Sequence, residues 1–159
     1  MKSASRIVAG LFSLALMVAG GAVQAAEHGQ ADEAHGPTKL QLNKGRKWET
    51  DAPLRQSMAN LRASVSDKLE AIHKGKLGAD EAQALGAKID AEVATLVAQC
   101  KLEPKADAVL HVIIADLLAA SEILQGKHKG SRAAAARKVV RALNNYGRYF
   151  DDPQWQALK

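Results

Sequence analysis

Four segments of this chain repeat an apolar side chain every three or four residues, which is the spacing of one face of an α-helix. No segment alternates with the period of two that a half-buried strand shows. The segments span 53–75, 79–100, 104–126 and 131–150, and only a few residues separate them. Because short connections favour antiparallel neighbours, the sequence predicts an all-α, up-down-up-down four-helix bundle.

Residue types that begin or end helices stand at the expected places. Asp51 and Ser131 can cap the first and fourth predicted helices with their side-chain oxygens. Pro53 and Pro104 fall in the first turns of the first and third helices, where a backbone N–H has no intrahelical acceptor. Gly126 marks the end of the third helix. These signals support the four predicted helices.

In this topology one end of the bundle collects most of the aromatic and ligand-type side chains, and we call it the aromatic end. It holds the start of the first helix, the end of the second, the start of the third and the end of the fourth. Its members are Trp48, Met58, Cys100, Asp107, His111, Tyr146, Tyr149, Phe150 and Trp155. We predict that a binding site of the bundle, if it has one, lies at this end.

The chain begins with the pattern of a bacterial secretory signal peptide. Lys2 and Arg6 precede an apolar run over 7–18, and small residues follow as far as Ala25. The run is shorter than the roughly 20 apolar residues of a membrane span. We expect cleavage after Ala25, with Ala26 as the alternative, and a periplasmic product that is not embedded in a membrane.

The sequence therefore divides into three predicted regions. Residues 1–25 are the signal peptide, and 26–47 form a polar tail without apolar periodicity, which predicts a flexible segment. Residues 48–159 form the bundle domain. Removal of the signal peptide takes two of the 22 basic residues and none of the 17 acidic ones, so the net charge falls from +5 to +3.

Neither the charge nor the motifs point to an enzyme or to a nucleic-acid partner. The basic residues are not interleaved with aromatic ones, which argues against nucleic-acid binding. The sequence contains no Gly-rich phosphate loop, no H-E-x-x-H motif and no recognisable nucleophile–His motif. We expect an exported, non-enzymatic binding or accessory protein.

Cys100 is the only cysteine, so it has no partner for an internal disulfide. It can be a small buried hydrophobic residue, form an intermolecular disulfide in a homodimer, or serve as a soft metal ligand. Asp107 and His111 stand four residues apart and share a helix face. Together with Met58, these residues form a candidate site for copper or zinc, although each also has a purely structural interpretation.

A second candidate metal site lies at the expected mature N-terminus, which begins Ala26-Glu27-His28. The free α-amine, two deprotonated backbone amides and the imidazole at position three place four nitrogens in a plane, a geometry that suits Cu(II). Cleavage after Ala26 would remove this motif.

Two segments resemble those that carry the haem ligands in the periplasmic b-type four-helix cytochromes and the related cytochrome c′ fold. Pro-Leu-Arg-Gln-Ser-Met58-Ala-Asn-Leu resembles the segment with the ligating Met, and Asn144-Asn-Tyr-Gly147-Arg-Tyr resembles the segment with the ligating His. Gly147 occupies the position of that His, and the C-x-x-C-H attachment signature is absent. The resemblance implies a shared fold without the ligand set, so we predict no bound haem. The alternative is a haem-binding electron carrier that uses Met58 with His111.

The chain also resembles a group of small exported bacterial proteins with no assigned activity. The similar segments are Cys100-Lys-Leu, Ala106-Asp-Ala-Val-Leu-His111 and Tyr-Gly-Arg-Tyr-Phe-Asp-Asp-Pro-Gln-Trp155. This resemblance implies a common bundle and directs attention to Cys100, Asp107 and His111, but it implies no reaction.

Overall fold

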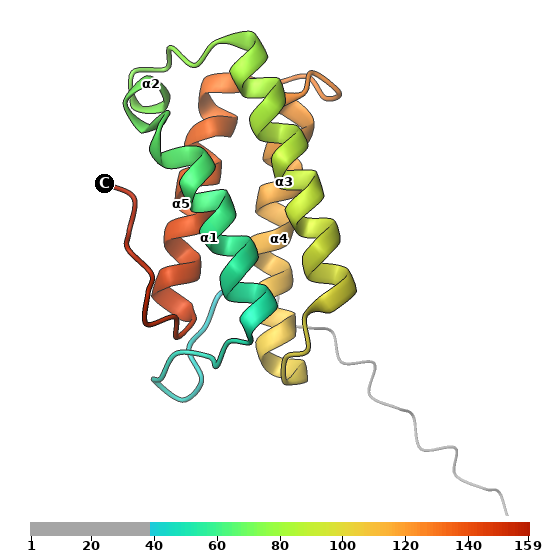
Figure 1. Cartoon of the computed structure of the whole chain (residues 1–159), viewed down its shortest axis with the longest axis vertical. Helices are drawn as coiled ribbons and strands as arrows, with labels where there is room; N and C mark the ends of the chain where they lie inside the picture. The colour runs from blue at the N-terminus through green and yellow to red at the C-terminus, as the bar shows by residue number, and fades with distance from the viewer. Residues whose placement is uncertain (1–38) are drawn as a thin grey trace, which may run out of the picture. The chain divides into compact units, whose positions relative to one another are not determined.

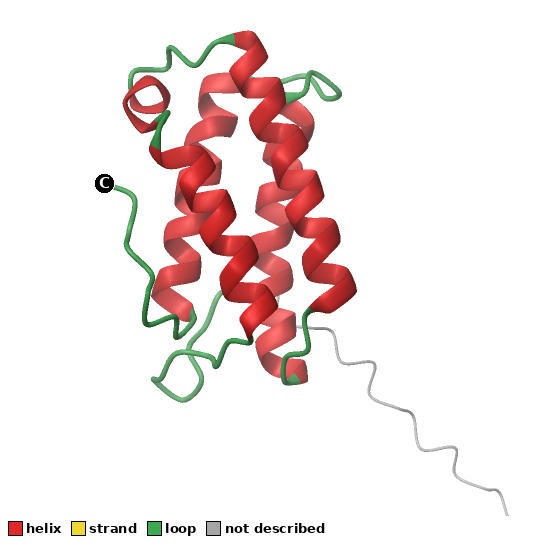
Figure 2. Ribbon diagram, viewed as in Figure 1, coloured by secondary structure: helices red, strands yellow, loops and turns green. Residues whose placement is uncertain are grey.

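The computed structural model describes residues 39–159, and within this range every regular element is a helix (Figures 1 and 2). The helices are α1 (Ala52–Ser66), α2 (Leu69–His73), α3 (Ala79–Gln99), α4 (Pro104–Leu124) and α5 (Arg132–Tyr149). The predicted all-α class is confirmed. The predicted signal peptide and the motif Ala26, Glu27 and His28 lie outside the described residues.

The four long helices, α1, α3, α4 and α5, lie side by side with alternating directions (Figure 1). Contacts are extensive between α1 and α3, between α3 and α4, and between α4 and α5, and they are sparser between α1 and α5. The segment after α5 covers this sparser side, where Nε of Arg62 donates to the carbonyl oxygen of Gln156. In the described part of the chain, no helix is both long and apolar enough to cross a membrane.

The first predicted helix, 53–75, is divided into α1 and the short helix α2, which is a correction to the sequence prediction. The hydroxyls of Ser64 and Ser66 donate to the carbonyl oxygens four residues earlier, each at 2.9 Å. Such bonds compete with the helical ladder, and Asp67, the next residue, is a weak helix former. The break changes the direction of the chain, and Ile72 of α2 is fully buried.

The predicted helix starts are confirmed in atomic detail. Oδ1 of Asp51 accepts from the backbone N–H of Leu54 at 2.9 Å, and Oγ of Ser131 accepts from Ala134 at 3.2 Å. Both proline residues lie in first turns, as predicted. Beyond the end of α4, Gly126 has a φ of 73°, a left-handed conformation that glycine adopts without strain.

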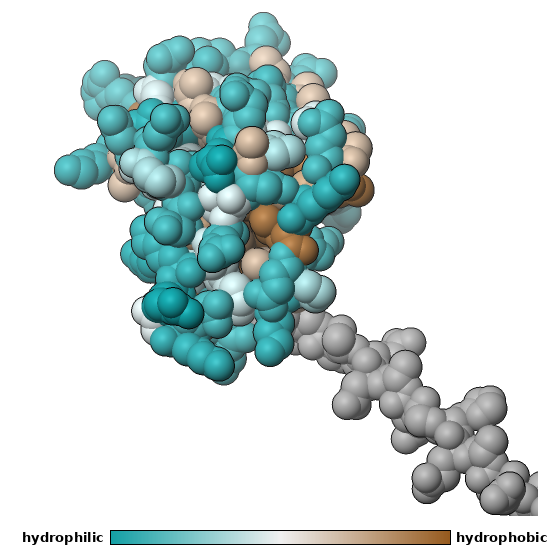
Figure 3. Space-filling view, turned by 60° about the horizontal axis from the view of Figure 1, so that its bottom comes forward, coloured by the Kyte–Doolittle hydropathy of each residue, from teal (hydrophilic) through white to brown (hydrophobic). Residues whose placement is uncertain are grey.

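The predicted apolar faces converge on one core. Its fully or almost fully buried side chains include Leu54, Met58, Leu61, Val65, Leu85, Ile89, Leu96, Leu110, Ile113, Leu117, Val139 and Leu143. At the aromatic end, which Figure 3 turns toward the viewer, the surface is mainly hydrophilic with a small apolar area. The helices are therefore joined by continuous apolar packing, and polar side chains cover that end.

Residues 39–47, which the sequence predicted to belong to the flexible tail, have a defined conformation. Asn43 and Arg46 exchange two backbone hydrogen bonds of 2.8 and 2.9 Å around a tight turn. Nε1 of Trp48 donates to the carbonyl oxygen of Gln41 at 2.7 Å, and only 4% of Trp48 is exposed. A buried tryptophan thus fixes this segment to the bundle.

Gly147, in the last part of α5, makes room for Trp155 of the C-terminal segment. A Cβ atom at position 147 would lie 2.1 Å from both Cδ1 and Nε1 of the indole. The indole also packs edge-on against the Tyr146 ring, with centroids 4.8 Å apart. Its Nε1 is buried without a hydrogen-bond partner among residues 39–159, since the side chain lies directly on the helix.

We expect Gly147→Ala to lower the free energy of unfolding by about 1–3 kcal/mol, because the added methyl group displaces the indole. In a Trp155→Ala background the same substitution should instead stabilise by about 0.5–1 kcal/mol, because alanine is the better helix former. Urea unfolding of the four proteins in this cycle measures both effects. An equal effect of Gly147→Ala in the two backgrounds would contradict the proposed contact.

Candidate functional site

The carboxylate of Asp51 joins the start of α1 to the end of α3. It accepts from the Leu54 N–H within α1 and, through Oδ2, from the backbone N–H of Lys101 at 2.6 Å. The thiol of Cys100 donates to Oδ1 at 3.3 Å. One side chain therefore holds two helix ends together at the aromatic end.

The Asp51 carboxylate and the Cys100 thiol shift each other's pKa. Burial alone would raise the pKa of Asp51, but the N–H groups of Lys101 and Leu54 stabilise the carboxylate more strongly, and the net pKa is lowered. Burial raises the pKa of the Cys100 thiol, and the hydrogen bond to the Asp51 carboxylate raises it further, to about 12. Cys100 is therefore a protonated thiol at neutral pH.

A second group of contacts surrounds Tyr146 near the end of α5. The fully buried Tyr146 ring stacks on Phe150, with centroids 5.6 Å apart, and its hydroxyl donates to Oδ2 of Asp152 at 3.0 Å. Burial raises the pKa of Tyr146, and the neighbouring Asp152 carboxylate adds to the shift. The phenol is thus a fixed hydrogen-bond donor.

Trp48 completes the aromatic end by pairing its backbone with the chain after α5. Its N–H donates to the carbonyl oxygen of Tyr149 and its carbonyl oxygen accepts from Asp151, both at 2.8 Å. The segments before α1 and after α5 are thereby held together.

The residues of the predicted bundle metal site differ in burial and in their contacts. Met58 is fully buried in the core, whereas the side chain of His111 is 62% exposed on α4. The thiol of Cys100 donates to Asp51. In the described range no three side chains of His, Cys, Asp or Glu are placed to hold a metal ion.

The predicted pair of Asp107 and His111 is formed. Nδ1 of His111 lies 3.3 Å from Oδ2 of Asp107 and 2.9 Å from its carbonyl oxygen. A proton on Nδ1 would serve these two acceptors and leave Nε2 as the metal-binding nitrogen. Both side chains are largely exposed, so the pair resembles an ordinary helix-surface contact more than a built site.

A shallow depression of about 730 Å³ opens beside Asp51. It is lined by side chains of both charges, among them Arg46, Lys47, Glu49, Lys101, Glu103 and Asp151. Because the charges are mixed, the depression does not select a ligand of one sign.

Sequence reasoning found the helix cap at Asp51 but missed its bond to Lys101, and it missed Asp152 altogether. Neither contact has a local pattern, since Asp51 and Lys101 lie far apart in the sequence and Asp152 stands in the segment after a helix. No protein-family model matches this sequence, and no curated protein and no solved structure has a significant match to it.

We expect Asp51→Asn to lower the free energy of unfolding at pH 7 by about 1–2 kcal/mol, because the amide keeps only one acceptor oxygen for two N–H groups. Since the pKa of Asp51 is lower in the folded state, its carboxylate stabilises the fold above about pH 4 and loses this effect as the pH falls. Wild type and variant should therefore converge as the pH falls below the folded-state pKa of Asp51. Urea unfolding across this range, with Asp151→Asn as the exposed control, measures the difference; a constant gap would contradict it.

Cys100 should react with iodoacetamide at pH 8 at least about a hundredfold more slowly than free cysteine, because so little thiolate is present at a pKa of about 12. Mass spectrometry of timed samples gives the rate, and urea-unfolded protein gives the unprotected reference. Asp51→Asn should accelerate the reaction, whereas Lys101→Gln should not. Folded wild-type protein that reacts as fast as the unfolded chain would show that the bond to Asp51 does not protect the thiol.

Proposed function

We propose that this chain is an exported, non-enzymatic binding or accessory protein that takes up a transition metal, copper first, at the N-terminus of its mature form. The observation that carries the proposal is the sequence Ala26-Glu27-His28 directly after the expected cleavage site. The donors would be the amine of Ala26, the backbone nitrogens of Glu27 and His28, and the His28 imidazole.

The geometry of the aromatic end argues against a catalytic role for its Asp, Tyr and Cys side chains. Its Asp51 carboxylate and its Tyr146 phenol are engaged in contacts that hold segments together. A nucleophilic cysteine requires a lowered pKa, whereas the pKa of Cys100 is raised to about 12. These groups are arranged as structural connections.

The positions of the other candidate ligands favour the N-terminal motif over a site in the bundle. In a copper site or a haem site built from Met58 and His111, both side chains would have to bind the same metal ion. Met58 is buried in the core, whereas His111 is exposed on the surface. A dimer linked through Cys100 would require the thiol to leave Asp51. The N-terminal motif needs no rearrangement of the bundle.

The decisive experiment is a Cu(II) titration of the exported protein, after intact mass has established that it begins at Ala26. We expect one equivalent to bind with the visible absorption band of a planar four-nitrogen site. Binding should weaken as the pH falls below about 6.5, because protonation removes the imidazole donor.

The matched control carries one additional residue before Ala26, which moves His28 to position four and leaves the bundle unchanged. This protein should lose the planar band, and His111→Ala should keep it. If the extended protein binds as well as the original, the N-terminal site is wrong. If the intact mass still includes residues 1–25, the proposed export is wrong.

A further inference from the structure

Helix α5 carries five basic side chains and no acidic one between Arg132 and Tyr149. The five are Arg132, Arg137, Lys138, Arg141 and Arg148. Only Lys138 has an ion-pair partner among the described residues, with Nζ 2.8 Å from Oδ1 of Asp116. Arg137 and Arg141 stand one turn apart, so their like charges repel. Arg137 and Arg141 thus form a short row of guanidinium groups that have no ion-pair partner among the described residues, at some cost to the stability of the helix.

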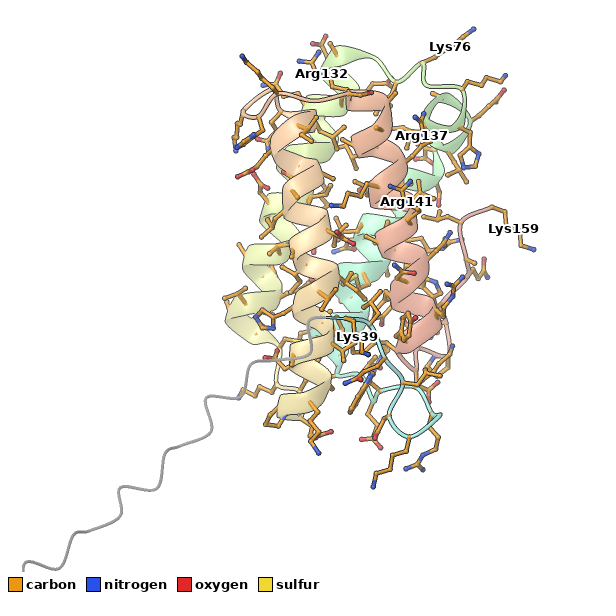
Figure 4. The ribbon with its side chains drawn as sticks, turned by 180° about the vertical axis from the view of Figure 1, so that it is seen from behind. Lys39, Lys76, Arg132, Arg137, Arg141 and Lys159 are labelled. Carbon is orange, nitrogen blue, oxygen red and sulfur yellow. The ribbon has the colours of Figure 1, made fainter. Side chains whose placement is uncertain are left out.

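Basic residues from other segments extend this row into a larger surface. Figure 4 shows its labelled members on the side of the molecule seen from behind, on and around α5. We call this surface the basic face, and its residues are Lys39, Lys76, Arg132, Arg137, Arg141 and Lys159. All six are exposed, and none forms an ion pair with another residue of the range 39–159.

Two guanidinium groups of the face lie beside turns that flank α5. A Cβ at Gly75 would lie 3.7 Å from Nη1 of Arg137, and a Cβ at Gly126 would lie 3.4 Å from Nη2 of Arg132. Each guanidinium group therefore lies beside a glycine of a neighbouring turn. Lys76 directly follows the first of these glycines and is exposed.

The shape and composition of the basic face limit what it can bind. No residue of the face lines the depression beside Asp51 or the two depressions beside Arg55. Among residues 39–159, the large apolar side chains that are exposed are Leu42, Val97 and Leu118, none of which belongs to α5. The face therefore lacks the apolar or aromatic centre of a typical protein interface and the aromatic platforms that stack on nucleic-acid bases.

We propose that the basic face binds the surface of a lipid bilayer that contains anionic phospholipids. A guanidinium group can hold a phosphate through two parallel hydrogen bonds, and a bilayer presents many phosphates on a broad surface without requiring a pocket. No apolar side chain of the face enters the hydrocarbon, so the attraction is electrostatic and is screened by salt. This inference is independent of the proposed copper site.

The test is co-flotation of the purified protein with vesicles of phosphatidylcholine alone or with about one third phosphatidylglycerol. At low ionic strength the protein should float with the anionic vesicles only, and about 0.5 M NaCl should release it. Arg137→Gln/Arg141→Gln should lower the partition coefficient by about fivefold for each charge removed. Lys44→Gln/Lys101→Gln removes the same charge from the aromatic end and should have a much smaller effect.

Absence of wild-type binding to the anionic vesicles would overturn the proposal. Equal losses in the two double variants would overturn the assignment to α5 and attribute binding to net charge alone. Binding to an acidic peptide or to DNA at a salt concentration that abolishes vesicle binding would identify a different class of partner. Circular dichroism melting checks the fold of each variant. Arg137→Gln/Arg141→Gln should not lower the midpoint, because it removes repulsion and breaks no ion pair between described residues.

Discussion

The carboxylate of Asp51 is the connection on which the aromatic end depends. It accepts hydrogen bonds from the start of α1 and from the first residue after Cys100, and thereby fixes the end of α3 against α1. Two backbone N–H groups and a thiol donate to this partly buried carboxylate. Without these donors, the burial of its charge would lower the free energy of unfolding. Because the donors come from both helices, neither helix end can move without breaking a bond.

This connection also contributes to the chemistry of the only cysteine. Burial is the main cause that raises the pKa of Cys100, and the Asp51 carboxylate raises it further because it disfavours a second negative charge nearby. The thiol is therefore held protonated where a catalytic or metal-binding cysteine would need to ionise. The aromatic end therefore combines residue types that are common in active sites with an arrangement that suppresses their reactivity.

The closure of the bundle depends on a different contact, made by the segment after α5. Where α1 and α5 pack sparsely, Trp155 lies on Gly147, and the side-chain amide of Asn144 pairs with both backbone groups of Leu158 at 2.9 Å. On the outer surface of α5 the side chains are not packed. Arginine side chains there are exposed and form no ion pair with other described residues. One helix thus presents an apolar side for closure and a cationic side to the solvent.

The sequence by itself determined the helical class, the starts of the long helices, the approximate ends of α3, α4 and α5, and the apolar faces, because helix periodicity, caps and breakers act over a few residues. It did not show that the first predicted helix is divided after Ser66. It also identified the Asp107–His111 pair, which is local. Only the tertiary structure decided that Asp51 reaches Lys101, that Trp155 covers Gly147, and that Met58 is buried whereas His111 is exposed. These relations depend on the rotation and close approach of whole helices, which no local pattern encodes.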